Sequence, residues 1–298
     1  MAGHIVVVGS LNMDLVVRSP RHPQPGETLL GTEFHTFPGG KGANQAVAAA
    51  RLGGQVKMIG RVGADAFGDA LIQTLSQDGV DTRHIARLQD APTGVALITV
   101  DAAGQNTIVV VPGANGELSP PDLLAAESAF ETASVVVMQL EIPLLTVAYA
   151  ADLARRRGAC VVLNPAPAQP LGTTLKQVDV LIPNQPEAAL LTGAASARDA
   201  AKRLRASGVR SVIVTLGEDG VLVVEGETET HLPPHRVSVV DTTAAGDAFV
   251  GAFAVALAEG RSTREAAAWG NAAGALAVTR AGAQPSLPSR AELEQFLA

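Results

Sequence analysis

Two aspartates that bracket a short run of small residues, Asp241 and Asp247, are the clearest candidates for chemistry in the chain. The run ends in Ala245 and Gly246 and leads into an apolar stretch, residues 248–258, that has no polar face. We expect this stretch to be a buried helix. Free backbone N–H groups of Ala245, Gly246 and Asp247 at its first turn would then form an anion site of the kind that holds phosphates.

Asp247 has two interpretations. An aspartate at the start of a helix is often an ordinary N-cap. A cap does not require the small residues Ala245 and Gly246 before it, whereas an anion site does, because larger side chains would cover the N–H groups. Beside a bound phosphoryl group, Asp247 could accept the proton of an attacking hydroxyl. We expect the helix field to keep Asp247 ionised, which makes it a weak base that mainly orients the hydroxyl.

The composition excludes several classes of protein. Hydrophobic residues make up 47% of the 298 residues and charged residues 17%, which is typical of a buried sheet flanked by helices. A net charge of -7 offers no basic face for nucleic acid. The histidines lack zinc-ligand spacing, and the only cysteine, Cys160, excludes an intrachain disulfide and suits the cytoplasm. The N-terminal apolar run, residues 5–8, is too short for a signal peptide or a membrane span.

Alternating patterns along the chain predict an α/β fold with a doubly wound, mostly parallel central sheet flanked by helices. The strands predicted for this sheet are residues 5–8, 56–60, 135–138, 160–163, 178–182 and 211–215. Two further β-prone runs, residues 93–100 and 107–111, are joined by a glycine-containing turn and predict an antiparallel hairpin in a separate small sheet. Residues 18–38 are rich in proline and glycine and indicate an excursion from the core.

Polar residues follow several predicted strands, where open α/β sheets place their ligands. Asn12 and Asp14 follow the first strand, and Glu141 follows a later one, although turn chemistry or solvation would explain them equally well. The glycine-rich turn at residues 39–44 does not satisfy the phosphate-loop pattern, so Lys41 is not a phosphate-loop lysine. No G-x-G-x-x-G follows a strand, which disfavours a Rossmann dehydrogenase.

Taken together, these segments resemble the ribokinase family of carbohydrate kinases. Residues 241–253 match the family signature D-T-x-G-A-G-D and its aromatic-containing helix, with Ala244 where many members have Gly. Residues 39–44, Gly-Gly-Lys-Gly-Ala-Asn, match the family's second sugar-contacting element. The resemblance covers essentially the whole chain, with the elements in family order.

The resemblance implies a single ribokinase-like α/β domain, residues 1–298, with a small β-sheet lid over the sugar. The lid would be built from about residues 15–38 and 93–111. In the family this region is often a dimer contact, so we expect a cytoplasmic homodimer that pairs through its lid and has no nucleic-acid or membrane partner.

The family's ligands can be carried over to individual residues. The residues implied to bind the sugar are Asn12, Asp14, Gly40, Lys41, Asn44, Glu141 and Asp247. The residues implied to contact ATP are Asn184, Thr215, Gly217, Gly220, Gly246 and Asn271. Glu187 is implied to bind Mg²⁺ through water. Those implied to enclose a potassium ion, mostly through carbonyl oxygens, are Asp241, Thr243, Ala277, Arg280, Gly282 and Ser286. The local sequence has a second interpretation at both places. Asn184 and Glu187 also match the start of a helix, and residues 215–220 also match a hairpin turn.

The implied activity is ATP-dependent phosphorylation of D-ribose at its 5-hydroxyl, giving D-ribose 5-phosphate and ADP. Asp247 would orient and deprotonate the hydroxyl, while Mg²⁺ and the N–H groups of Ala245, Gly246 and Asp247 stabilise the transferring phosphoryl group. A sister kinase for fructose, deoxyribose, a keto-deoxy sugar or a nucleoside remains an alternative. A non-catalytic sugar-binding regulator is less favoured, because it would not need Asp247, Gly246, Asn184 and Glu187.

Overall fold

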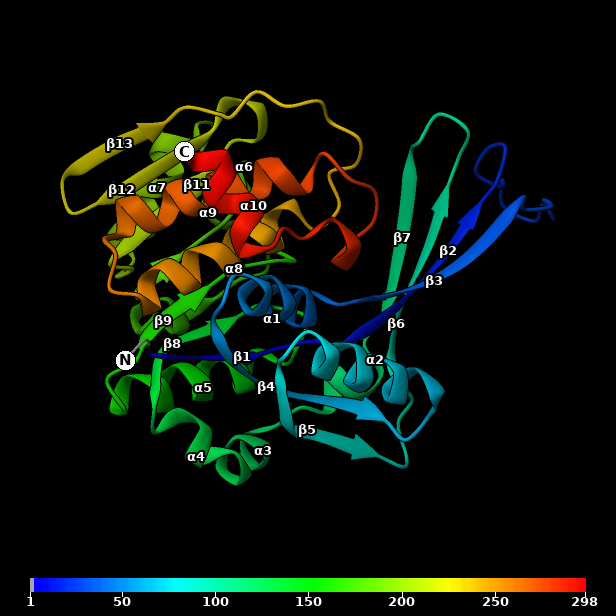
Figure 1. Ribbon diagram of the computed structural model, residues 1–298, viewed down its shortest axis with the longest axis horizontal. Helices are drawn as coiled ribbons and strands as arrows, with labels where there is room; N and C mark the ends of the chain where they lie inside the picture. The colour runs from blue at the N-terminus through cyan, green and yellow to red at the C-terminus, as the bar shows by residue number, and fades with distance from the viewer. Residues whose placement is uncertain (1–2) are drawn as a thin grey trace.

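Nine strands form the central sheet of the protein in the computed structural model, which describes residues 3–298 (Figure 1). Their order across the sheet is β13-β12-β11-β10-β9-β8-β1-β4-β5. Their bounds are β1 His4–Val8, β4 Gln55–Gly63, β5 Asp81–Leu88, β8 Ala133–Met138, β9 Cys160–Leu163, β10 Val180–Leu181, β11 Ser211–Thr215, β12 Val221–Glu225 and β13 Thr228–Leu232. All neighbours from β5 to β11 are parallel, and β12 and β13 add an antiparallel edge. The prediction of a mostly parallel sheet is confirmed.

Helices cover both faces of this sheet because its strands are apolar on both sides. In β1, Ile5 and Val7 face one core and Val6 and Val8 the other. The helices of the first core are α1 Lys41–Arg51, α2 Ala66–Gln77, α8 Ala245–Ala258, α9 Thr263–Ala277 and α10 Arg290–Leu297. Those of the second core are α3 Pro120–Ala125, α4 Glu127–Phe130, α5 Leu144–Arg156, α6 Gln185–Thr192 and α7 Ala197–Ala206. Within residues 3–298, no helix is long and apolar enough to cross a membrane.

Short 3₁₀ segments complete the connections between these elements. They are η1 Gly113–Glu117, η2 Gly172–Gln177, η3 Gly217–Asp219 and η4 Gln284–Ser286. The segment η3 lies in the turn between the antiparallel strands β11 and β12, as expected for the hairpin predicted at residues 215–220.

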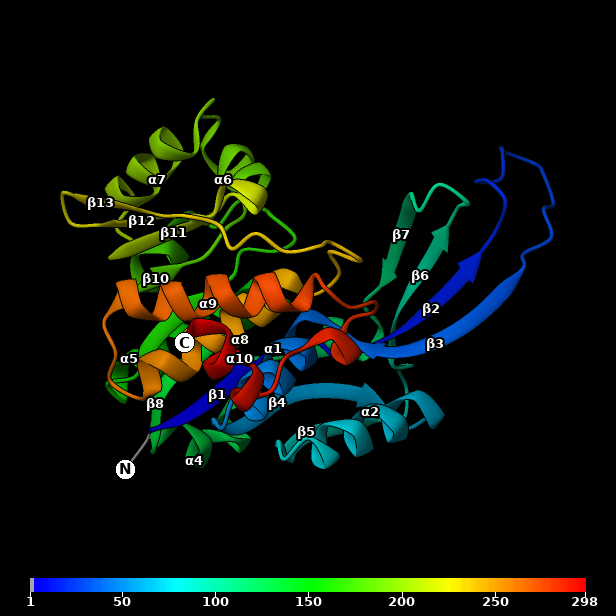
Figure 2. The same ribbon diagram turned by 45° about the horizontal axis from the view of Figure 1, so that its top comes forward.

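A separate four-stranded sheet projects from one end of the body (Figures 1 and 2). Its order is β3-β2-β6-β7, with bounds β2 Asn12–Arg18, β3 Glu33–Gly39, β6 Gly94–Val100 and β7 Asn106–Val111. The antiparallel pair β6 and β7 is the predicted hairpin. The sequence pattern did not predict β2 and β3 as strands, but the family resemblance implied that about residues 15–38 contribute to a small β-sheet. β2 and β3 pair with each other across the proline-rich excursion. The register of such a pair depends on both strands and on the connection between them, so neither strand predicts it alone.

The helix α8 occupies the centre of the first core, between α1 and α9 (Figure 2). Its side chains are buried on all sides from Asp247 to Ala256, as the uniformly apolar sequence predicts. Gly251 permits the contact with α1, because a Cβ atom there would lie 2.5 Å from the Cβ of Ala48. Close packing of α1 on α8 therefore fixes the amino end of α8 relative to the residues of α1.

Candidate active site

A cavity of about 200 Å³ opens at the carboxyl ends of β9, β10 and β11, next to the amino end of α8. Six of the residues predicted from the sequence line it, namely Lys41, Asn184, Glu187, Thr215, Gly246 and Asp247. Asn164 and Thr242 also line it, and neither was predicted. The cavity has the position at which open α/β sheets bind ligands.

The amino end of α8 differs from the expected cap. The N-cap residue is Ala244, in the left-handed region at φ 59°, and Asp247 is the third residue of the helix. The interpretation of Asp247 as an N-cap is therefore wrong. The N–H of Ala245 donates to the carbonyl of Thr242 at 3.3 Å, so Ala245 does not offer the free N–H group expected of it. The N–H groups of Gly246 and Asp247 have no partner in the described chain. A Cβ atom at Gly246 would meet nothing within 4 Å, so the approach to these groups is open.

The carboxylate of Asp247 is held by two amides of α1. Asn44 Nδ2 donates to Oδ2 at 3.0 Å, and Gln45 Nε2 donates to Oδ1 at 2.9 Å. Burial raises the pKa of Asp247, although the Lys41 charge and these two hydrogen bonds oppose the rise. We expected a weak base, but the direction of the pKa shift is the opposite. Burial outweighs the groups that favour the charged form and makes Asp247 a stronger base.

Glu141 organises the polar residues beneath the four-stranded sheet. Its Oε2 accepts hydrogen bonds from Ser10 Oγ at 2.6 Å, from the Lys41 backbone N–H at 3.1 Å and from Asn12 Nδ2 at 3.4 Å. Asn115, which was not predicted, donates from Nδ2 to Asn12 Oδ1 at 2.8 Å. The structure thus brings three predicted residues together from β2, the start of α1 and the segment after β8.

Asp14 and Lys41 complete this cluster electrostatically. Burial raises the pKa of Asp14 to about 7, and the nearby carboxylates of Glu141 and Asp247 add to the rise. Burial alone would lower the pKa of Lys41, but the surrounding carboxylates, Asp247 first, raise it on balance. Gly40, at φ 88°, is the N-cap residue of α1, and a Cβ atom there would lie 2.7 Å from the backbone N of Asn12. Glycine is required for that close approach.

The residues predicted for the nucleotide divide into two groups. Asn184 and Glu187 form the capping box of α6, with Glu187 N donating to Asn184 Oδ1 and Asn184 N donating to Glu187 Oε2, both at 2.8 Å. Both also line the cavity, so the local and the functional interpretations are compatible. Gly217, Gly220 and Asn271 are not among the lining residues. Asn271 Nδ2 donates instead to the carbonyl of Pro233 at 2.8 Å.

The residues predicted for potassium lie on two segments that Asp241 joins. Asp241 Oδ1 accepts from the N–H and hydroxyl of Thr243 at 2.9 and 2.6 Å, and Oδ2 accepts from the N–H of Gly282 at 2.8 Å. Burial opposes ionisation of Asp241, but these hydrogen bonds outweigh it and lower the pKa. Arg280 N donates to the Ala277 carbonyl at 3.2 Å, and the buried Ser286 hydroxyl donates to Ala283 O. Carboxylate, hydroxyl and carbonyl oxygens suit a hard cation.

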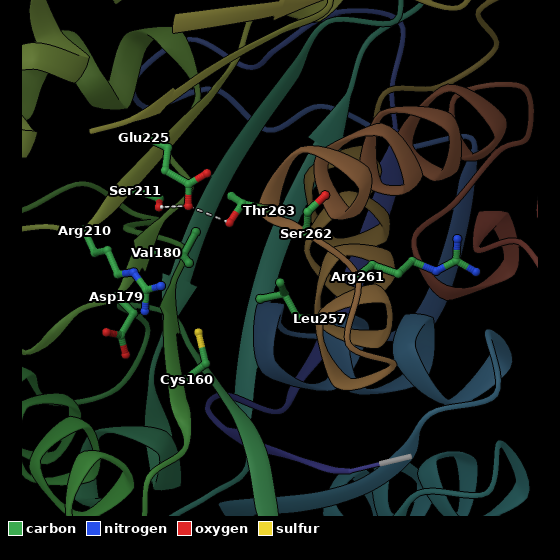
Figure 3. A pocket seen from close by; sticks show the side chains of 10 residues that line it. All are labelled: Cys160, Asp179, Val180, Arg210, Ser211, Glu225, Leu257, Arg261, Ser262 and Thr263. Atoms are coloured by element: carbon green, nitrogen blue, oxygen red, sulfur yellow. Dashed lines mark hydrogen bonds between the residues drawn. The ribbon is translucent and has the colours of Figure 1, made fainter. Parts of the chain in front are cut away.

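A larger cavity, of about 340 Å³, lies at the opposite ends of the same strands, near the amino ends of β9, β10 and β11 (Figure 3). Of its two carboxylates, Glu225 already accepts from the hydroxyls of Ser211 and Thr263, at 3.2 and 3.0 Å, and Asp179 accepts from the backbone N–H of Val161 at 2.9 Å. Burial raises the pKa of the Cys160 thiol to about 12, and Arg261 points away and stacks on Trp269 at 4.1 Å. This cavity therefore lacks an activated nucleophile, and the candidate active site is the one at Asp247.

Comparisons with known proteins identify the family of the chain. The model of the pfkB family carbohydrate kinases matches residues 2–290. The chain is 42% identical to a ribokinase of Haemophilus influenzae, over 98% of each protein, and 43% identical to a ribokinase of Bacillus subtilis, over 99% of each. It is 38% identical to a deoxyribokinase of Salmonella typhimurium, over 98% of each.

Solved structures show the same fold. A ribokinase of Thermotoga maritima superimposes with a TM-score of 0.93 at 41% identity, covering 99% of both chains. An Arabidopsis thaliana ribokinase complexed with ribose and ATP superimposes with a TM-score of 0.92 at 34% identity, covering 100% of this chain and 99% of the other.

Proposed function

The chain belongs to the pfkB family of carbohydrate kinases, and from this premise we propose that it transfers the γ-phosphoryl group of ATP to the 5-hydroxyl of D-ribose. The products are D-ribose 5-phosphate and ADP. The observation that carries the proposal is the position of Asp247, which lies in the first turn of α8 beside two free N–H groups and against the amides of α1. A base and an anion site thus adjoin the residues proposed to hold the sugar.

In this mechanism the oxygen of the ribose 5-hydroxyl attacks the γ-phosphorus while Asp247 accepts the hydroxyl proton. The bond between the γ-phosphorus and ADP breaks, and ADP leaves. The N–H groups of Gly246 and Asp247 stabilise the negative charge on the transferring group. Lys41 lies among the acidic groups of the cavity and lessens their repulsion of the triphosphate. Positioning of the two reactants contributes much of the rate, of the order of 7–11 kcal/mol in favourable cases.

The proposed ligands of the sugar are Asn12, Asp14, Gly40, Lys41, Asn44 and Glu141. Asn44 supports this role because its Oδ1 is buried and has no partner in the described chain. For ATP we propose Asn184, Thr215, Gly217, Gly220, Gly246 and Asn271. Only the first two and Gly246 line the cavity, so the nucleotide would extend beyond it along the β11–β12 turn.

Two cations complete the proposal. Glu187 is a cavity carboxylate whose pKa is raised, by burial first, so a divalent cation would relieve its unfavourable ionisation. We therefore assign Mg²⁺ to its vicinity, held partly through water, where it would neutralise phosphate charge. Potassium would be held at Asp241, Thr243, Ala277, Arg280, Gly282 and Ser286. The oxygen donors there fit it, and the ion would fix the loop that precedes α8.

The four-stranded sheet serves in this proposal as a lid and as the contact of a cytoplasmic homodimer. Ile108 and Val109 are successive residues of β7 and therefore point to opposite faces, yet they are 53% and 62% exposed. Phe34 on β3 and Leu97 on β6 are also largely exposed. An apolar sheet open on both faces favours a second copy of the chain as its cover.

The test is ADP release with MgATP and KCl on D-ribose, 2-deoxyribose, fructose, adenosine or no acceptor. Phosphorus NMR would identify the position of the new phosphate. We expect the highest kcat/KM on D-ribose, a 5-phosphate product and lower turnover when sodium replaces potassium. A higher kcat/KM on another acceptor would overturn the ribose assignment. Ribose binding in calorimetry without any turnover would overturn kinase activity and favour a regulator.

A further inference from the structure

Behind Asp247 lies a chain of amides that the sequence did not single out, with Gln45 and Gln139 buried and Asn164 half-buried. Gln45 is 1% exposed, and its Nε2 donates to Asp247 Oδ1 at 2.9 Å and to Asn164 Oδ1 at 3.1 Å. Its Oε1 accepts from Gln139 Nε2 at 2.6 Å. Gln45 thus uses both N–H groups and its carbonyl, on a buried face of α1 where Asn44 is the only other side chain with polar atoms.

Acceptor-only groups fix the orientation of these amides. The Asn164 Nδ2 donates to the carbonyl of Ile182 at 2.9 Å, which turns Asn164 Oδ1 toward Gln45. A carboxylate and this oxygen both require a donor, so the NH₂ group of Gln45 must face them. Flipping the Gln45 amide would place its oxygen against two other oxygens and would break three hydrogen bonds.

We infer that Gln45 is a positioning residue that holds the Asp247 carboxylate in the orientation needed to receive the sugar proton, with Gln139 and Asn164 locking Gln45 itself. Gln45 occupies one carboxylate oxygen, and Asn44 occupies the other from the adjacent position in α1. The two amides stabilise the anion without adding a positive charge, so Asp247 remains a base when the proton arrives. The inference rests on the proposed function, because it takes Asp247 to be the base.

The decisive variant is Gln45→Met, which keeps the length of the side chain and removes its hydrogen bonds. Loss of a donor to a carboxylate disfavours the charged form, so the acid limb of the kcat profile should move to higher pH by about one unit. We expect kcat at pH 7 to fall about ten-fold or more, with a smaller change in KM for ribose. The charged groups around Asp247, namely Lys41, Asp14, Glu141 and Glu187, are unchanged in this variant.

Gln139→Met is the second variant and keeps the proposal testable if Gln45→Met does not fold. It removes the bond that locks Gln45 but keeps the one between Gln45 and Asp247, so the pH limb should shift in the same direction by a smaller amount. Thr146→Val is the matched control. It also deletes one buried hydrogen bond, that of the Thr146 hydroxyl to the carbonyl of Leu118 at 2.6 Å, and it should lower thermal stability without moving the limb.

The outcomes separate the inference from the function on which it rests. If Asp247→Asn is inactive and the folded Gln45 and Gln139 variants keep the native pH profile, Gln45 is purely structural and the inference is overturned. If Asp247→Asn retains near-native turnover, Asp247 is not the base and the inference is overturned, whereas the phosphorylation of ribose stands on its own assay. A shifted limb in the glutamine variants together with an unshifted Thr146→Val profile would establish the positioning role.

Discussion

The side chain of Asn44 donates from Nδ2 to Oδ2 of Asp247 at 3.0 Å, across 203 residues of sequence. The carbonyl oxygen of the same amide, Oδ1, is buried and has no partner among residues 3–298. A buried acceptor without a donor is costly, and a sugar hydroxyl beside Asp247 would satisfy it. One amide therefore connects the proposed base with the proposed acceptor.

This relationship predicts different defects for its two residues. Asp247→Asn should lower kcat by roughly 10²–10⁴-fold with little change in ribose affinity, because it removes the proton acceptor. Asn44→Ala should lower kcat and also weaken ribose binding, because it removes contacts to both partners. Steady-state kinetics and calorimetric titration with ribose would separate the two effects. An Asn44→Ala variant with native ribose affinity would show that its free carbonyl does not bind the sugar.

Asp14 should make the protein less stable as the pH rises. Its pKa is raised from 3.8 to about 7, so the folded protein holds a proton that the unfolded chain releases between these values. The free energy of unfolding therefore falls across this window. At pH 8, Asp14→Asn should unfold with up to about 4 kcal/mol more free energy than the native protein, since each pKa unit corresponds to about 1.4 kcal/mol.

Urea unfolding of both proteins at several pH values from about 4 to 8 would check this prediction. The difference between them should shrink toward zero at the acidic end, where Asp14 is protonated in both states. A difference that is independent of pH would mean that Asp14 is ionised without cost. Ribose binding should weaken in Asp14→Asn, because Asp14 is a proposed ligand of the sugar. This function would explain why the protein has a residue here that lowers its stability.

Gly246 and Gly251 form a matched pair on α8. A methyl group at Gly246 meets no atom within 4 Å, so Gly246→Ala should fold with unchanged or slightly higher stability but should obstruct the phosphoryl group and lower kcat. At Gly251 the new Cβ would lie 2.5 Å from that of Ala48, so Gly251→Ala should lose about 1–3 kcal/mol of stability. Thermal unfolding and kinetics of both variants test this. Native turnover in Gly246→Ala would exclude phosphoryl binding at that turn.

Ala244 should be a source of strain. It is the one non-glycine residue of the described chain with positive φ, and its left-handed conformation costs an L-residue about 1–2 kcal/mol. Ala244→Gly would relieve this cost, although the greater flexibility of the unfolded chain offsets part of the gain. We expect a net increase in unfolding free energy of about 0.5–1 kcal/mol in denaturant titrations. A decrease would indicate that the alanine methyl group makes compensating contacts.

The four-stranded sheet should determine the oligomeric state. The double variant Ile108→Glu with Val109→Glu places a charge on each face of β7 and should convert a dimer into monomers in light scattering. Gln105→Glu is the control, because it adds a charge in the turn before β7 without touching either apolar face. An unchanged mass for the double variant would show that the copies do not pair through this sheet.

The sequence alone determined the parts of the protein that depend on neighbouring residues. The apolar run 248–258 predicted the buried helix, and the small residues Ala245 and Gly246 predicted an accessible helix terminus. Asn184 and Glu187 predicted the start of α6, since a capping box is a local arrangement. Buried strands were readable for the same reason, because continuous β-branched runs in a chain of this composition pack on both faces.

Tertiary structure alone decided which distant residues meet. Nothing near Gln45 indicates that it reaches Asp247, 202 positions away, and nothing near Asp241 indicates its bond to Gly282. The raised pKa of Asp247 also depends on burial by segments far apart in the sequence, which is why the local field of α8 predicted the wrong direction. Periodicity and composition show which faces are buried. Sheet order and the packing of α1 on α8 determine which buried polar groups face one another.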